Sequence, residues 1–278
     1  MMDENTLRRL QLTQLEILKI FDDFCRKNGL KYSLYAGTLL GAVRHKALIP
    51  WDDDLDVCME RKEYDRFISL WEKSHPEEYI LQNKENTPKF WQSFSKIRKD
   101  HTTFLQEEKE RGKYHTGIFI DIFPLDRIPN GKLSRAVFRW HCMKYQLMTR
   151  EFVPPKAGKI VKLGSRIILG GTPKKIREKV RNRELEKITR NNEDNSLEIA
   201  AIETMQSLRS TFSKNMFDSY IDLPFEDGKF MCFSDWDGHL KQKFGDYMLF
   251  PPEKDRVWKH HPIIIDFERN YEELNIQK

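Results

Sequence analysis

The chain has 278 residues, a formal net charge of +5, and hydrophobic and aromatic fractions of 39% and 12%. This length and composition predict a folded protein with a buried core and exclude a disordered chain. Four cysteines without paired spacing exclude a disulfide framework and a zinc site, and indicate reduced thiols. Because the sequence also lacks a secretory signal pattern and a membrane-length apolar run, we expect a cytoplasmic protein.

The N-terminal region predicts a helix, a strand and a second, short helix. Apolar residues recur at helical steps over residues 6–28, and residues 30–35 alternate in the manner of a strand. Gly37 and Thr38 then form a turn, and residues 38–43 predict a helix whose N-terminus points back at the strand end. Backbone N–H groups at such a terminus attract phosphate, so Gly37 and Thr38 are candidate phosphate-binding residues.

An acidic run follows, with four carboxylates within five residues: Asp52, Asp53, Asp54 and Asp56. Apolar and polar residues alternate over 54–60, which predicts a strand with Asp54 and Asp56 on one face. Residues two apart on a strand face lie about 6.5–7 Å apart, close enough to share a metal ion, whereas a helix would separate them by about 200°. Carboxylates this close need a cation, and we expect Mg²⁺, with Mn²⁺ as the alternative.

Further along the chain, the pattern predicts one helix and three strands, over residues 61–73, 79–82, 90–98 and 116–123 respectively. Lys96 and Arg98 share one face of their strand and are, with Arg44, candidates to stabilise phosphate charge. Asp121 stands opposite a row of isoleucines. A lone acid in so apolar a strand is costly unless it meets a cation, so we expect Asp121 to be a third metal ligand.

The second part of the chain has a different character. The α/β half is expected to end at Pro124, Pro129 and Gly131. Residues 132–210 are predicted to be mainly helical, with breaks at Pro154-Pro155 and over 170–173, and residues 217–252 to return to short strands and turns.

Positive charge gathers in this second part. Residues 131–190 hold 17 Lys or Arg against four acids, while the rest of the chain is net acidic. Such a block is typical either of solvated helix faces or of a surface that faces membrane, nucleic acid or another phosphate-rich polymer.

Three motifs resemble the LicD family of phosphocholine transferases and related enzymes, which includes the fukutin-related proteins. They are Gly-Thr-Leu-Leu-Gly-Ala-Val-Arg-His at 37–45, Ile-Pro-Trp-Asp-Asp-Asp-Leu-Asp at 49–56 and Phe-Ile-Asp-Ile-Phe-Pro-Leu-Asp at 119–126. The resemblance implies an α/β (mixed α+β) fold, with a nucleotidyltransferase-like mixed sheet and flanking helices over 1–130. Residues 131–278 would form a mainly helical, basic region whose short C-terminal strands complete the acceptor side, as a second domain or as part of one continuous domain.

The resemblance also implies roles for individual residues. The family's Gly-Thr turn, its acid-x-acid strand and its third acid fall on Gly37-Thr38, on Asp54 and Asp56, and on Asp121; Asp52 matches the acidic run as well. We therefore expect Asp52, Asp54, Asp56 and Asp121 to be catalytic. Asp54, Asp56 and Asp121 would bind the metal, while Asp52 or Asp121 would take the acceptor's proton.

The implied reaction moves a phospho-substituent from a CDP-linked donor to a hydroxyl of a glycan or lipid-linked glycan, and releases CMP. Phosphocholine is the foremost cargo, and glycerol phosphate, ribitol phosphate or a sugar phosphate are the alternatives. Teichoic acid and lipopolysaccharide precursors are acceptors of this kind. A choline cargo would need aromatic faces, and the available residues are Trp51, Trp91, Phe94, Tyr114, Phe119 and Trp236. The basic block would then touch anionic lipid at the inner membrane face, and no nucleic-acid partner is expected.

Each candidate residue also has a purely structural interpretation. The acids of residues 52–56 could form a solvated loop, or an N-cap whose acids favour the start of a helix. Asp121 could be a core acid paired with a nearby basic residue. Lys96 and Arg98 could lie on an exposed strand face, and Thr38 could cap a helix.

Two other functions use the same features. One is nucleotidyl transfer to a small molecule or RNA, which would release pyrophosphate instead of CMP. The other is non-enzymatic binding of anionic polymers by the basic block, which would fall steeply with salt.

Overall fold

A computed structural model describes residues 3–107, 110, 112–150, 152–153, 158–193 and 195–274 of the chain. The chain separates into two compact units. The first comprises Met1–Gln82, Ser95–Pro124 and Met216–Lys278, and the second comprises Asn83–Phe94 and Leu125–Asn215. Strand β6 (Phe119–Ile128) gives its first half to the first unit and its second half to the second.

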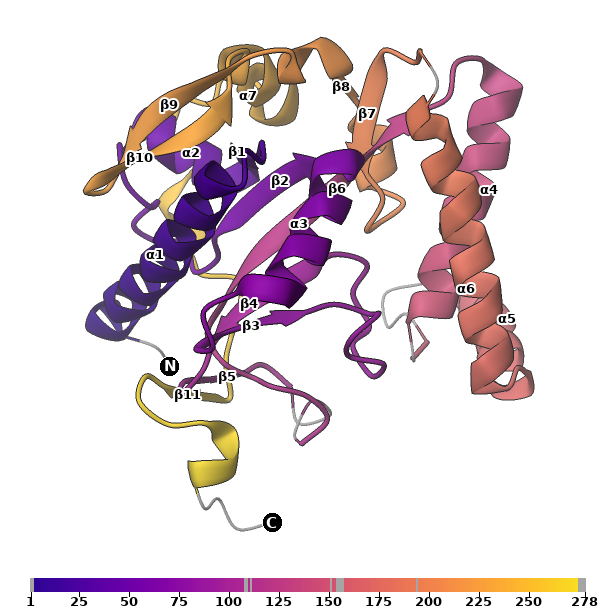
Figure 1. Ribbon diagram of the computed structural model, residues 1–278, viewed down its shortest axis with the longest axis horizontal. Helices are drawn as coiled ribbons and strands as arrows, with labels where there is room; N and C mark the ends of the chain where they lie inside the picture. Colours follow the sequence, from indigo (N-terminus) through magenta and orange to yellow (C-terminus); the bar gives the residue numbers. More distant parts are fainter. Residues whose placement is uncertain are drawn as a thin grey trace. The chain divides into compact units, whose positions relative to one another are not determined.

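A sheet with flanking helices forms the first unit (Figure 1). Its strands β1 (Ser33–Leu34), β2 (Asp56–Glu60), β4 (Ser95–Lys99) and β3 (Tyr79–Gln82) join β6 in the order β1-β2-β6-β4-β3. Two small ladders add β5 (Thr103–Leu105) with β11 (Ile264–Asp266), and β9 (Tyr220–Phe225) with β10 (Gly228–Phe233). The helices are α1 (Glu4–Lys27), α2 (Ala36–Arg44), α3 (Arg61–Ser74) and α7 (Trp236–Phe244).

Helices α1 and α3 pack side by side through aromatic residues (Figure 1). The rings of Phe21 and Phe67 lie 5.2 Å apart between centroids, and those of Phe24 and Trp71 lie 4.7 Å apart. Asp3 caps α1 by accepting a hydrogen bond from the Thr6 amide. The apolar period of the sequence therefore placed both helices, and the mixed α/β class is confirmed.

Four predicted strands differ in extent. The strand predicted over 54–60 begins only at Asp56, so Asp54 lies in the loop before β2. Residues 30–35 yield only the short β1, and only the last part of 90–98 forms β4. The strand predicted over 116–123 begins later and ends later in the structure, because β6 starts at Phe119 and continues through Pro124 to Ile128. Pro124 falls between the residues that pair with β4 (119–122) and those that pair with β7 (125–128), where its missing N–H breaks neither ladder.

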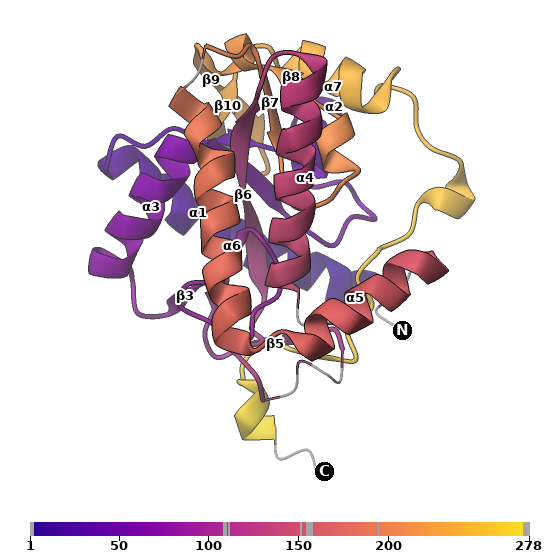
Figure 2. The ribbon, with the colours of Figure 1, turned by 90° about the vertical axis from the view of Figure 1, so that its right-hand side faces the viewer.

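The second unit is mainly helical, as predicted. It contains α4 (Lys132–Thr149), α5 (Lys159–Gly171) and α6 (Lys174–Thr189), and the second half of β6 pairs with β7 (Glu198–Ala201), which pairs with β8 (Phe212–Ser213). Figure 2 shows α4 and α6 side by side, with α5 leading into the start of α6. The core between them includes Phe138, Tyr145 and Ile188.

The predicted break over 170–173 is confirmed, while Pro154-Pro155 lies outside the described residues. Short 3₁₀ helices complete the chain: η2 (Arg190–Glu193), η3 (Ser207–Arg209), η4 (Lys214–Phe217), η5 (Glu253–Asp255) and η6 (Tyr271–Leu274). The prediction of only strands and turns over 217–252 missed α7. This helix buries just His239 and Leu240, too few residues to give a helical period. Within the described ranges, every helix is too short or too polar to cross a lipid bilayer.

Candidate active site

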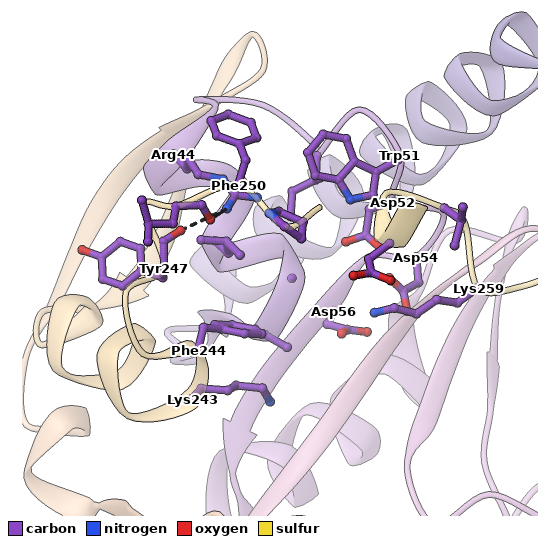
Figure 3. Close-up of a pocket in the computed structure, with 18 of the residues that line it drawn as sticks. Arg44, Trp51, Asp52, Asp54, Asp56, Lys243, Phe244, Tyr247, Phe250 and Lys259 are labelled. Atoms are coloured by element: carbon purple, nitrogen blue, oxygen red, sulfur yellow. Dashed lines mark hydrogen bonds between the residues drawn. The ribbon is translucent and has the colours of Figure 1, made fainter. Parts of the chain in front are cut away.

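A pocket of about 540 Å³ opens in the first unit beside the acidic run (Figure 3). One wall carries the carboxylates of Asp52, Asp54 and Asp56, and the opposite wall comes from α7 and the loop after it. The lining residues are Ala36, Gly37, Leu40, Arg44, Ile49, Trp51, Asp52, Asp54, Asp56, Lys243, Phe244, Asp246, Tyr247, Leu249, Phe250, Pro251, Asp255, Val257 and Lys259. The structure thus brings together five of the nine predicted site residues: Gly37, Arg44, Asp52, Asp54 and Asp56.

The turn before α2 is built around the acids. A Cβ atom on Gly37 would lie 2.6 Å from Oδ2 of Asp52, so only glycine leaves room for this carboxylate. The hydroxyl of Thr38 accepts a hydrogen bond from the backbone N–H of Asp56 at 2.8 Å, and the Tyr35 amide donates to the Asp56 carbonyl at 3.0 Å. Thr38 therefore holds the start of β2 against α2, whose N-cap residue is Tyr35.

Two buried glutamines of α1 hold the acidic loop from behind. The side-chain amide of Gln11 donates to the carbonyl oxygens of Ile49 and Asp52, at 3.0 and 2.8 Å. That of Gln14 donates to the carbonyl of Asp53 at 3.0 Å. The carbonyls of Asp52 and Asp53 gain a donor in this way, and that of Ile49 gains a second one beside the backbone N–H of Asp52. The backbone that presents the carboxylates is consequently fixed.

Crowding of the carboxylates disfavours their charged forms. Burial, followed by the charge of Asp54, raises the pKa of Asp52 to about 7. Burial and the charges of Asp54, Asp121 and Asp52 raise the pKa of Asp56 well above its ordinary value. Both pKa values are raised, as expected for buried carboxylates that lie close to other negative charges. The interpretation of residues 52–56 as a solvated acidic loop is wrong, because Asp52 and Asp53 are buried and Asp54 and Asp56 are half-buried.

Asp53, unlike its neighbours, binds the backbone of the C-terminal segment. Its buried carboxylate accepts hydrogen bonds from the backbone N–H groups of Lys259, at 3.2 Å, and His260, at 2.7 Å. Nδ1 of His260 lies 3.3 Å from the same carboxylate and 3.9 Å from that of Asp54. Burial opposes charge on this ring, but the hydrogen bond with Asp53 and the charge of Asp54 raise the pKa of His260.

These hydrogen bonds to Asp53 hold the backbone of Lys259 beside the pocket, and the Lys259 side chain points toward the carboxylates (Figure 3). The positive charge of Lys259 opposes the rise in the pKa of Asp52, and Lys243 of α7 acts likewise on Asp56. Neither lysine belongs to a periodic pattern or a motif that would have marked it in the sequence. Proximity to Asp53 could not be inferred across more than 200 residues.

Asp121 and Lys96 form a buried ion pair. They face each other across the β4–β6 ladder, and Nζ of Lys96 lies 2.5 Å from Oδ1 of Asp121. Burial lowers the pKa of Lys96 to about 8 and raises that of Asp121, in each case against their mutual attraction. Oδ1 of Asp121 is therefore paired with a basic residue, as the structural interpretation of this acid predicted. Asp121 also acts electrostatically on Asp56, so its role as a metal ligand stays a prediction.

Arg98 is committed elsewhere in the core. Its Nε donates to Oε1 of Gln82 and its Nη1 to the carbonyl of Gly117, both at 2.7 Å. The aromatic ring of Phe119 lies 4.9 Å from the guanidinium and 3.3 Å from Nζ of Lys96. Neither Lys96 nor Arg98 is on the exposed strand face that was one alternative, since both are about 3% exposed.

Arg44 joins α2 to the far wall of the pocket. Its Nη1 donates to the carbonyls of Tyr247 and Leu249, at 3.0 and 3.1 Å, and its guanidinium lies 4.8 Å from the ring centroid of Phe250. The ring of Phe250 also lies 6.1 Å from that of Trp51. Arg44 thus positions an aromatic wall opposite the acids, as the dashed lines of Figure 3 mark.

The donor set suits a hard divalent cation. Oxygen atoms of Asp52, Asp53 and Asp54 all lie within 4.8 Å of one another, but Asp53 is already engaged by the two backbone N–H groups. Asp52, Asp54 and Asp56 are the carboxylates of this acidic run that line the pocket. All-oxygen ligands of this kind are those that Mg²⁺ and Mn²⁺ prefer.

Fold and pocket together define a mixed α/β protein with a carboxylate cluster at the start of a central strand. The family model for the "LicD/FKTN/FKRP, nucleotidyltransferase domain" matches residues 29–157. The chain is 32% identical over 271 residues to "Lipopolysaccharide cholinephosphotransferase LicD" of Haemophilus influenzae, which covers 94% of this chain and 97% of that protein. An uncharacterized protein of Rickettsia prowazekii is 28% identical over 151 residues, 46% of this chain and 55% of its own. The chain belongs to the LicD family.

Proposed function

We propose that this protein transfers phosphocholine from a CDP-linked donor to a hydroxyl group of a lipopolysaccharide-type glycan and releases CMP. The observation that supports this most is the row of three carboxylates, from Asp52, Asp54 and Asp56, on one wall of the pocket. The similarity over nearly the whole chain to a protein named for cholinephosphate transfer to lipopolysaccharide supports the cargo and the acceptor.

Asp54 and Asp56, with Asp52 beside them, would hold Mg²⁺ or Mn²⁺. Bound there, the ion would offset negative charge on the donor diphosphate and on the leaving nucleotide. Lys259 and Lys243 flank the acids and would contact the remaining phosphate oxygens. The N-terminus of α2 would add backbone N–H groups at Gly37.

The transfer itself is an in-line displacement at the phosphorus that carries choline. The acceptor oxygen forms a new bond to this phosphorus while the bond to the CMP oxygen breaks. Asp52, whose carboxylate lines the pocket beside Asp54 and Asp56, would take the acceptor's proton. Lys96 would keep Asp121 charged and in place behind Asp56.

Aromatic residues of the far wall would recognise the donor. Trp51, Phe244, Tyr247 and Phe250 line the pocket. Aromatic faces attract a quaternary ammonium and also stack on a pyrimidine base. Of the aromatic residues expected from the sequence to serve choline, only Trp51 is among the described residues that line this pocket.

The direct test incubates the purified protein with CDP-choline, Mg²⁺ and a lipopolysaccharide acceptor that lacks phosphocholine. We expect CMP and a phosphocholine-bearing acceptor, detected by chromatography and mass spectrometry, and loss of both with Asp54→Asn/Asp56→Asn. Asp222→Asn is the matched control, since this acid lies on β9 and its partner is Arg26.

Three results would contradict the proposal. Pyrophosphate release instead of CMP would favour nucleotidyl transfer. A fully active Asp54→Asn/Asp56→Asn variant would remove the carboxylates from the mechanism. Release of CMP with every donor except CDP-choline would refute the cargo.

A further inference from the structure

Helix α5 of the second unit carries three exposed large apolar residues. Leu163 and Ile167, one turn apart, are 61% and 66% exposed, and Ile168 is 40% exposed. The polar Ser165 on the same helix is only 5% exposed. A helix that packs on its own domain has the opposite arrangement. The exposed apolar face of α5 is therefore suited to contact an apolar partner outside the unit.

Basic residues border this apolar face. At about 100° per residue, Lys159 and Arg166 project roughly 40° and 60° to one side of Leu163, and Ile167 projects about 40° to the other. Lys162 follows Arg166 on the basic side. The wider segment 158–183 holds nine Lys or Arg and a single acid, Glu178. An apolar stripe thus lies beside a cationic stripe on one exposed helix.

The apolar stripe and the cationic stripe together indicate which class of partner would fit this helix. A nucleic acid would engage the basic residues but would offer nothing apolar to Leu163 and Ile167. A second copy of the chain would bring one basic segment against another. An anionic lipid surface has acyl chains beneath charged headgroups, so it receives both stripes at once.

We propose that α5 is an interfacial helix that docks the protein on anionic lipid bilayers. Leu163 and Ile167 enter the boundary between headgroups and acyl chains, and Lys159, Lys162 and Arg166 contact the anionic headgroups. Long basic side chains suit this position because their stems lie along the apolar layer while their charges stay in water. The proposal rests on the second unit alone and is independent of the reaction that the first unit catalyses.

The test uses the full-length protein and vesicle co-sedimentation. We expect binding to vesicles of phosphatidylcholine with phosphatidylglycerol, much weaker binding to phosphatidylcholine alone, and a decrease with added salt. Leu163→Gln/Ile167→Gln should weaken binding by about tenfold or more, because each apolar side chain that stays in water forfeits its transfer free energy. Lys159→Gln/Lys162→Gln/Arg166→Gln should weaken it by about fivefold for each charge removed.

Leu12→Gln/Leu197→Gln is the matched control, since these leucines are 48% and 64% exposed on other elements. This variant should bind vesicles as the unaltered protein does. Thermal unfolding of all variants checks that none has lost its fold.

A labelled variant provides a second, independent measurement. All four native cysteines are buried, so a thiol introduced by Leu163→Cys reacts selectively with a polarity-sensitive dye. We expect a blue shift of its emission on anionic vesicles, and no shift for the same dye at Leu197→Cys.

Three outcomes would overturn the proposal: vesicle binding that survives Leu163→Gln/Ile167→Gln unchanged, a dimer that these substitutions dissociate while vesicles are not bound, or binding to an oligonucleotide but not to vesicles.

Discussion

Asp53 offers a sharp test because it holds the C-terminal segment through a few defined contacts. Its side chain is fully buried. Two backbone N–H groups donate to it, from Lys259 at 3.2 Å and from His260 at 2.7 Å, and the imidazole of His260 makes a third, longer contact. The substitution Asp53→Ala removes all three and leaves the two N–H groups without an acceptor.

The magnitude follows from these contacts. A hydrogen bond to a charged group contributes about 1.5–3 kcal/mol, and a buried donor without a partner costs about 1–3 kcal/mol. Only the 2.7 Å bond has short geometry, so we expect Asp53→Ala to lower the free energy of unfolding by about 3 kcal/mol. His260→Ala keeps both backbone donors and removes only the long contact, so it should cost about 1 kcal/mol.

Urea unfolding of both single variants and of the double variant measures these terms. Lys259→Met is the matched control, because the backbone N–H of Lys259 binds Asp53 while its ammonium does not; its unfolding free energy should stay within about 0.5 kcal/mol of the unaltered protein. Limited proteolysis should cut Asp53→Ala faster near residues 257–262. If Asp53→Ala is as stable and as resistant to proteolysis as the Lys259→Met control, Asp53 is not an anchor.

Three further predictions concern the pocket and the helical unit. Gly37→Ala should weaken divalent-cation binding by about tenfold, since the new Cβ displaces the Asp52 carboxylate, while the protein stays at least as stable because alanine favours α2; calorimetry with unchanged affinity would refute this. Because burial and the neighbouring acids raise the pKa of Asp52 to about 7 and raise that of Asp56 as well, metal binding should release protons at about pH 6, and affinity should rise with pH. Calorimetry in buffers of different ionisation enthalpy measures this proton release, and an affinity that does not depend on pH would contradict the prediction. Burial opposes charge on Glu184, but hydrogen bonds from Lys144, His141 and Lys187 lower its pKa from 4.5 to about 2. Its contribution of roughly 2–3 kcal/mol is therefore present above pH 4.5 and lost toward pH 2, and Glu184→Gln should abolish this acid-dependent loss in thermal unfolding.

The local alternation of apolar and polar residues was enough to predict the strand at the acidic run. Leu55, Val57 and Met59 alternate, and all three are buried as predicted. This alternation sufficed to put Asp56 on the pocket side of β2, because a strand has a strict two-residue period, while Asp54 lines the pocket from the loop before the strand. Helices α1 and α3 were equally predictable from their apolar stripes.

Contacts between segments that are distant in the sequence could not be predicted from local residue patterns. That Lys96 pairs with Asp121 depends on the register of β4 on β6, which neither strand encodes by itself. The lysine and arginine were expected to reach phosphate, but each has its partners in the core. Gln11 and Gln14 gave no signal either, since a glutamine on the buried face of a helix looks like a break in its apolar stripe.

The most direct test of the central claim is a calorimetric titration of the purified protein with Mg²⁺ and Mn²⁺. If the carboxylates that face the pocket form a metal site, the unaltered protein binds the cation stoichiometrically and Asp54→Asn/Asp56→Asn does not, while Asp222→Asn behaves as the unaltered protein. Equal binding by the unaltered protein and the double variant, or no binding by the unaltered protein above the pKa of Asp52, would contradict the account.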